Sequence, residues 1–183
     1  RDDVESRGLG DVYKRQFLDM AKIIADKRED IDFIILGNGE MWQQCQDFIK
    51  ENKLENRVYM AGQGTDPVMM NSYYKYIDLN TLTSYSESFP YALLEGARCK
   101  CATVATAVGG IPEMIIDGDS GCLVQSGDSK ALAECVEMLC DKDDIRIRYG
   151  VNFYERAKEN FSSQAMANTH KKIYEKIIKE NVK

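Results

Sequence analysis

Two carboxylates at a fixed spacing are the first residues in this sequence that could act on a ligand. Glu87 and Glu95 stand eight residues apart in the stretch ESFPYALLEGA. If both lay on one α-helix, they would be separated by about 12 Å along its axis and by about 80° around it. They would then neither touch nor share a face, which disfavours a shared proton or a metal clamp. The spacing favours two separate contacts to a ligand.

The residues between the two glutamates predict how they are placed. A helix is expected over residues 88–99, with Pro90 in its first turn, where a missing N–H costs nothing. Glu87 then precedes the helix, and Glu95 lies about two turns into it.

The hydrophobic periodicity of the chain alternates between two and 3.6 residues, which is typical of strands interleaved with helices. Strands are expected over residues 31–36, 58–61, 77–83, 101–106 and 121–124. Helices are expected over residues 17–27, 40–52 and 88–99, after the Asp66-Pro67 cap, briefly after Pro112, and from Asp128 with a break near 161–163.

This order of elements predicts the fold class and the place of a site. We expect an α/β fold with a Rossmann-like, doubly wound, mostly parallel sheet flanked by helices, followed by C-terminal helices. In such sheets ligands bind beyond the carboxyl ends of the strands. Loops rich in glycine, hydroxyl or acidic residues follow four strands, at 37–40, 62–65, 84–87 and 107–113. They predict one pocket for an anionic or polyhydroxylated ligand.

Composition limits the remaining possibilities. The 183 residues suit one domain, and 24 Lys and Arg against 30 Asp and Glu leave a net charge of −6. That charge disfavours nucleic acid as the main ligand. The apolar runs are far shorter than the roughly 20 residues that span a bilayer. A cytoplasmic protein is expected.

The cysteines and the single histidine give no further site. Cysteines stand at positions 45, 99, 101, 122, 135 and 140, without the paired spacing of a zinc site. We expect small buried hydrophobes in a reduced environment. His170 lies in a charged amphipathic segment and is expected to be a solvated helix residue.

The motifs together resemble a known family. Glu87 to Glu95 matches the E-x7-E motif of the retaining, family-4 glycosyltransferases, also called glycosyl transferases group 1, which have the two-domain GT-B architecture. The segment ATAVGGIPEMI at 105–115, with Asp117-Gly118 and the strand at 121–124, is similar to the next block of that family. The resemblance covers about residues 17–170 and is to the C-terminal, donor-binding domain.

The resemblance implies a role for each matching residue. Glu95 would accept hydrogen bonds from the ribose hydroxyls of a UDP- or GDP-sugar, since a carboxylate can bind both hydroxyls of a cis-diol. Glu87 would contact the transferred sugar as the catalytic residue. The helix start would bind sugar oxygens or the diphosphate. The expected substrate-binding residues besides Glu95 are Ser88, Phe89, Pro90, Tyr91, Gly37, Gly39, Gly62, Gly109 and Gly110.

Several of these residues also have structural explanations. Gly109-Gly110 fits a turn that needs positive φ as well as a close approach to the ligand. Glu113 also suits the first turn of a helix, where a carboxylate is favourable. Tyr73, Tyr74 and Tyr76 are expected to pack between helix and sheet.

The sequence also departs from the family pattern. Lys100 stands where a helix-ending glycine is expected, and Ala102 where proline is usual. The donor domain of the family begins with a strand, a Gly-Arg pair and a nearby lysine, which neutralise the leaving diphosphate. By the resemblance, this segment should precede Phe17. Residues 1–16 instead have no apolar period, and we expect them to be a foreign leader, with Lys14 and Arg15 not forming the diphosphate clamp.

The expected organisation is therefore a leader at 1–16 and a nucleotide-sugar-binding domain at 17–183, with the N-terminal acceptor domain absent. A glycan or a lipid-linked acceptor, and any association with a membrane surface, would belong to a full-length enzyme. We expect no metal and no transferase activity in this chain. Two alternatives stay open: a non-catalytic nucleotide-binding module, and a GT-B-type sugar-nucleotide epimerase.

Overall fold

The computed structural model of the chain describes residues 15–37, 39–62 and 66–181. Most of the expected leader lies outside these residues. A helix spans 15–25, and the elements that follow are β1 (Phe33–Leu36), α2 (Trp42–Glu51), β2 (Val58–Gly62), α3 (Pro67–Tyr76), β3 (Leu79–Leu82), α4 (Tyr91–Arg98), β4 (Ala102–Thr106), α5 (Ile111–Met114), β5 (Cys122–Val124), α6 (Ser129–Asp141), α7 (Asp143–Asn160) and α8 (Ser163–Asn181).

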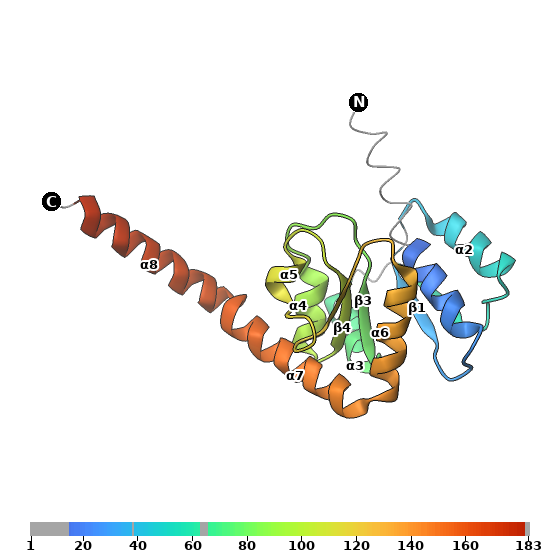
Figure 1. The fold of residues 1–183 in the computed structure, drawn as a ribbon. Helices are drawn as coiled ribbons and strands as arrows, with labels where there is room; N and C mark the ends of the chain where they lie inside the picture. Colours follow the sequence, from blue (N-terminus) through green and yellow to red (C-terminus); the bar gives the residue numbers. More distant parts are fainter. Residues whose placement is uncertain (1–14, 38, 63–65, 182–183) are drawn as a thin grey trace.

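All the described strand pairs are parallel, and helices connect the strands (Figure 1). β1 pairs with β2, and a second sheet has the order β3-β4-β5. The α/β class with parallel strands flanked by helices is thus confirmed. The described strands form two sheets, where the sequence predicted one.

The sheet of β3, β4 and β5 is covered on both faces. Its central strand β4 is buried throughout. Ala102 and Val104 of β4 join a core cluster with helix 15–25, α2 and α6, whereas Ala105 joins a second cluster with α4, α5 and α7. Alternate residues of a strand point to opposite faces, so β4 contributes to both cores. This double cover explains why every residue of the strand, including Thr103 and Thr106, is buried.

The helix after the first glutamate begins later than predicted. α4 starts at Tyr91, and Pro90 is its N-cap in an extended conformation with φ −73° and ψ 111°. The proline ring disfavours the helical region for the preceding residue, so Phe89 stays in the loop. Ser88 and Phe89 are therefore part of the loop before α4 and not of its first turn.

The C-terminal helices α7 and α8 are separated by the predicted break at residues 161–162, and α7 begins at Asp143, directly after Lys142 ends α6. α8 extends away from the sheets (Figure 1). It exposes an apolar stripe of Met166, Ile173, Tyr174, Ile177 and Ile178. His170 lies exposed on the same helix, as expected. Within the described residues, no helix combines the length and apolar character needed to cross a bilayer.

Two helices end on a lysine in the left-handed conformation. Lys100, at the position where the family pattern has glycine, has φ +58°, and Lys53 after α2 has the same value. The N–H of Lys100 donates to Ala97 O at 2.8 Å and the N–H of Cys101 donates to Gly96 O at 3.1 Å. These two bonds form a Schellman motif. The end of the helix thus has the geometry that a glycine usually provides, although Lys100 occupies the position.

We expect Lys53→Gly to raise the free energy of unfolding by about 0.5–1 kcal/mol. The left-handed conformation costs a non-glycine residue about 1–2 kcal/mol, and this outweighs the extra backbone entropy of glycine, about 0.5–1 kcal/mol. Urea denaturation followed by circular dichroism measures the change.

Lys100→Gly serves as the matched comparison. Lys100 Nζ lies 5.2 Å from the centroid of the Tyr154 ring, a cation–π contact that glycine loses. The gain should therefore be close to zero at this position. A loss of stability in Lys53→Gly would contradict the interpretation.

Candidate functional site

Glu87 lies half-buried in the loop between β3 and α4. Ser84 Oγ donates a hydrogen bond to Glu87 Oε1 at 2.9 Å. A carboxylate has about four lone-pair sites on its two oxygens, so this bond leaves most of its acceptor capacity unused. Glu87 is thus a positioned carboxylate in the loop beyond the carboxyl end of β3.

Ser84 itself is held by the neighbouring strands. Its N–H donates to Thr106 Oγ1 at 2.9 Å, and the Thr106 hydroxyl donates to Ser84 O at 2.6 Å. Ser126 Oγ donates to the same carbonyl oxygen at 3.2 Å. The ends of β3, β4 and β5 are therefore tied together beneath Glu87.

The glycine pair at 109–110 packs directly on the backbone of the glutamate loop. A Cβ atom on Gly109 would lie 1.7 Å from Glu87 O, and one on Gly110 would lie 2.1 Å from Ser88 O. Gly109 also has φ +53°, and the N–H of Gly110 donates to Glu87 O at 3.0 Å. Both residues must lack a side chain because the loop that carries Glu87 occupies that space.

The loop after β5 is held by helix 15–25, a contact that the sequence did not predict. Gln16 of helix 15–25 is 2% exposed and accepts a hydrogen bond from the N–H of Gly127 at 2.9 Å. Gln16 Nε2 also donates to Gln125 O at 3.3 Å. More than a hundred residues separate these partners, so no local pattern could have found them. Arg15 is exposed and pairs with Asp19 at 3.0 Å.

Glu95 lies exposed on α4, as predicted, and has a buried neighbour that the sequence did not assign to the site. Tyr74 on α3 is 6% exposed, and its hydroxyl lies within the electrostatic influence of Glu95. Burial, and then the charge of Glu95, raise the pKa of Tyr74, so this phenol stays protonated at neutral pH. Tyr76, in contrast, is 90% exposed, so the expectation that it packs against the sheet is wrong.

The loop between the two glutamates carries aromatic side chains. Phe89 is 40% exposed and makes edge-to-face contacts with Tyr91 and Phe161, at centroid distances of 5.9 Å and 5.6 Å. Pro90 is buried, and Ser88 is exposed. Phe161 stands at the break between α7 and α8, so the loop contacts the base of the C-terminal helix.

Gly37 and Gly39 follow β1, and Gly62 is the last residue of β2. The N–H of Gly37 donates to Gly62 O at 2.7 Å, which brings these two loops together. Gly37 and Gly62 have φ of +119° and +74°, and a Cβ atom on either would meet none of the described atoms within 4 Å. The backbone is thus open to close approach at these two glycines. Among the described residues, no hydrogen bond joins this pair to the loops around Glu87.

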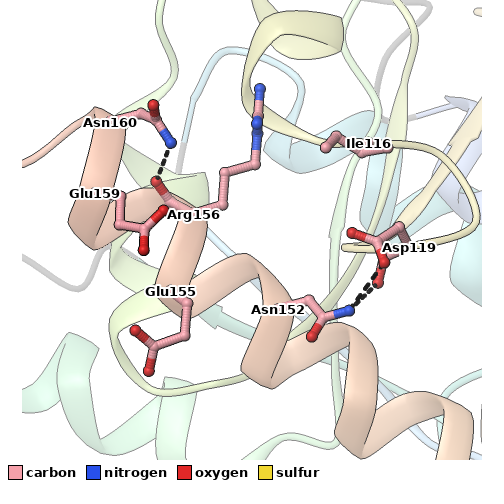
Figure 2. A pocket seen from close by; sticks show the side chains of 7 residues that line it. All are labelled: Ile116, Asp119, Asn152, Glu155, Arg156, Glu159 and Asn160. Carbon is pink, nitrogen blue, oxygen red and sulfur yellow. Dashed lines mark hydrogen bonds between the residues drawn. The ribbon is translucent and has the colours of Figure 1, made fainter.

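An open pocket lies elsewhere, between α7 and the loop after α5 (Figure 2). It encloses about 360 Å³ and is lined by Ile116, Asp119, Asn152, Glu155, Arg156, Glu159 and Asn160. Arg156 turns away from its acidic neighbours and donates to the carbonyl oxygens of Met114 and Glu113. None of the predicted site residues lines this pocket, which is open and polar.

The cysteines belong mainly to the core. Cys45, Cys101 and Cys122 are buried, and the other three are half-buried. None of the six forms a disulfide. Burial raises the pKa of the Cys101 thiol to about 12, which keeps it protonated and unreactive. In the part of the chain that the structure describes, no three histidine, cysteine or acidic side chains group around a metal position.

Comparison with known proteins identifies the family. The model of the family described as glycosyl transferases group 1 matches residues 13–160. The chain belongs to this family. The matched range contains both glutamates and the glycine pair.

Solved structures of similar proteins share the fold of this glycosyl transferases group 1 chain. The C-terminal domain of a glycosyl transferase group 1 family protein from Francisella tularensis has a TM-score of 0.75 at 24% identity, over 83% of this chain and 80% of that one. Anabaena HepE in complex with UDP-glucose has a TM-score of 0.75 at 24% identity, over 87% and 46%. The fold is therefore that of a GT-B C-terminal domain.

A curated relative is the N-acetyl-alpha-D-glucosaminyl L-malate synthase of Bacillus anthracis, which is 28% identical over 161 residues. That match covers 88% of this chain and 41% of the synthase. The chain spans less than half the length of the first curated relatives that it matches.

Proposed function

We propose that this chain is the donor-binding domain of a retaining glycosyltransferase and binds a nucleotide diphosphate sugar. The observation that carries the proposal is the separation of the two glutamates by the loop and the start of α4. Glu87 is held in the loop after β3 by Ser84, and Glu95 is exposed about one turn into α4. Glu87 would contact the transferred sugar, and Glu95 would accept from the ribose hydroxyls.

Other features support the same ligand. The open backbone at Gly37 and Gly62 leaves room for a close approach of the nucleotide. HepE, which has the same fold, was solved with UDP-glucose, and the Bacillus anthracis relative is by name an N-acetyl-alpha-D-glucosaminyl L-malate synthase. In a whole enzyme, which we place in the cytoplasm, the sugar would pass to a glycan or a lipid-linked acceptor.

We expect UDP- or GDP-sugars to stabilise the chain and Glu95→Ala to abolish that effect. Ligand at a hundred times its Kd adds about 2.7 kcal/mol to the apparent free energy of unfolding. A thermal-shift series with UDP, GDP and their sugars measures it, because binding to the native state raises the melting temperature.

Glu134→Ala is the matched control. Glu134 is an exposed helical glutamate on α6 and is not among the predicted ligand-binding residues. It should leave the ligand response unchanged. If the unaltered chain responded to none of these ligands, donor binding would be refuted. A response that survives Glu95→Ala would refute the role of Glu95.

The proposal includes two properties of the isolated chain. Donor binding needs no divalent metal, so the titration should be the same in EDTA and in magnesium. Transfer also needs cations that stabilise the leaving diphosphate, and we propose that this chain alone does not supply them. Acceptor-dependent release of nucleotide by the chain in a coupled assay would contradict this part.

A further inference from the structure

Arg156 of α7 donates two side-chain hydrogen bonds to the end of the short helix α5. Its Nε donates to Met114 O at 2.9 Å, and its Nη2 donates to Glu113 O at 2.6 Å. The last carbonyl groups of a helix have no partner within the helix. A guanidinium fork can bind two such oxygens at once and carries the positive charge that a helix C-terminus favours. Arg156 therefore fixes α5 to α7.

Arg156 makes these bonds although carboxylates stand close by on its own helix. Glu155 and Glu159 line the same open pocket. A glutamate three residues away on a helix is a common partner for an arginine. Figure 2 shows the Arg156 side chain pointing away from both carboxylates. The guanidinium thus anchors the backbone of α5 instead of forming a surface ion pair with these two residues.

The helix α5 in turn supports the loop that carries Glu87. The N–H of Gly110, the N-cap of α5, donates to Glu87 O at 3.0 Å, and a Cβ on Gly110 would lie 2.1 Å from Ser88 O. The N–H of Glu113 donates to Gly110 O at 3.1 Å. The end of α5 that Arg156 holds and the turn that touches Glu87 therefore belong to one short hydrogen-bonded unit.

A second contact connects Arg156 to the same loop through aromatic side chains. Arg156 Cζ lies 5.9 Å from the centroid of the Phe161 ring, within reach of a cation–π contact. Phe161 packs edge-to-face on Phe89 at a centroid distance of 5.6 Å. Phe89 lies two residues beyond Glu87. Arg156 thus contacts two supports of residues 87–89, one made of backbone and one of side chains.

We propose that Arg156 is a positioning residue for Glu87, which it holds where the carboxylate can contact the transferred sugar. This inference rests on the proposed donor binding. Without the anchor, the loop would have to be ordered when the ligand binds, and that cost weakens binding. The effect should be confined to the sugar, because Glu95 lies on α4, which its own buried residues pack into the core.

The chain offers a matched control on the same helix. Arg148 is exposed, and its Cζ lies 5.7 Å from the ring of its neighbour Tyr149. Replacing either arginine by methionine removes a guanidinium and keeps an unbranched side chain, but only the change at Arg156 releases α5. Arg156→Lys is a milder change, because lysine keeps the charge but cannot reproduce the fork.

The test is isothermal titration of the whole chain with UDP-glucose, UDP-N-acetylglucosamine and GDP-mannose, and with UDP and GDP alone. Arg156→Met should weaken the nucleotide sugar that binds about two- to tenfold, as expected when side chains must be ordered on binding. It should leave the affinity for the matching nucleoside diphosphate unchanged. Arg156→Lys should give a smaller loss, and Arg148→Met should change neither affinity. In a Glu87→Gln background, Arg156→Met should have no further effect on the nucleotide sugar.

The contrary outcomes separate the two proposals. If the unaltered chain bound none of these ligands, the proposed function would fail and this inference with it. If Glu87→Gln weakened the nucleotide sugar but Arg156→Met did not, the inference about Arg156 alone would be overturned. Equal weakening of the nucleotide sugar and its diphosphate would make Arg156 a structural residue and would also overturn it. If Arg156→Met did not fold, Arg156→Lys would decide by the same criteria.

Discussion

Gly109→Ala should lower the free energy of unfolding by about 2–5 kcal/mol and abolish the response to nucleotide sugars. The new Cβ would lie 1.7 Å from Glu87 O, and the residue has φ +53°. The conformation costs alanine about 1–2 kcal/mol, and overpacking adds about 1–3 kcal/mol. The loop that carries Glu87 has to move, so the carboxylate leaves its position. Urea denaturation and thermal shift with ligand measure the two effects.

Two other glycines separate the causes. Gly118 has φ +74°, but a Cβ there would meet only Tyr149 Oη, at 4.0 Å, so Gly118→Ala should show the conformational cost alone. Gly110 has φ −80°, and a Cβ there would lie 2.1 Å from Ser88 O, so Gly110→Ala should show the steric cost alone. A Gly109→Ala variant as stable as Gly118→Ala would show that the loop is not packed on the glycine pair.

Phe153→Ala should lower the free energy of unfolding by about 3–5 kcal/mol. Phe153 of α7 is 0% exposed and belongs to the core cluster with Leu93 and Ala97 of α4 and Ile111 of α5. Truncating a buried phenylalanine removes its transfer free energy and leaves a cavity. The expected loss is a large part of the 5–15 kcal/mol that stabilises a typical domain. The midpoint of a urea transition measures it.

Ile147→Ala is the comparison on the same helix. Ile147 is 62% exposed, and alanine is the better helix former, so stability should change by no more than about 0.5 kcal/mol. A loss below about 1 kcal/mol in Phe153→Ala would mean that α7 does not hold α4 and α5 against the sheet.

Local sequence rules accounted for most elements of the fold. The Asp66-Pro67 pair predicted a cap, and Asp66 Oδ1 accepts from the N–H of Val68 at 2.9 Å. The break near Phe161 was also predicted, because caps and periodicity depend on residues within a few positions of one another. The start of α4 was misplaced because proline suits both a first helical position and the residue before it.

The spacing of Glu87 and Glu95, the glycine pair and the order of the elements were enough to assign the fold class and the family. They were also enough to predict that the two carboxylates act separately. How these residues are held could be seen only in the three-dimensional structure. Three such contacts are the hydrogen bond from Ser84 to Glu87, the packing of Gly109 on the glutamate loop and the hydrogen bond between Gln16 and Gly127. Most of these partners lie about 20 or more residues apart, and even Ser84 and Glu87 depend on a loop fixed by Thr106. Such contacts follow from the packing of strands and helices, which no local period encodes.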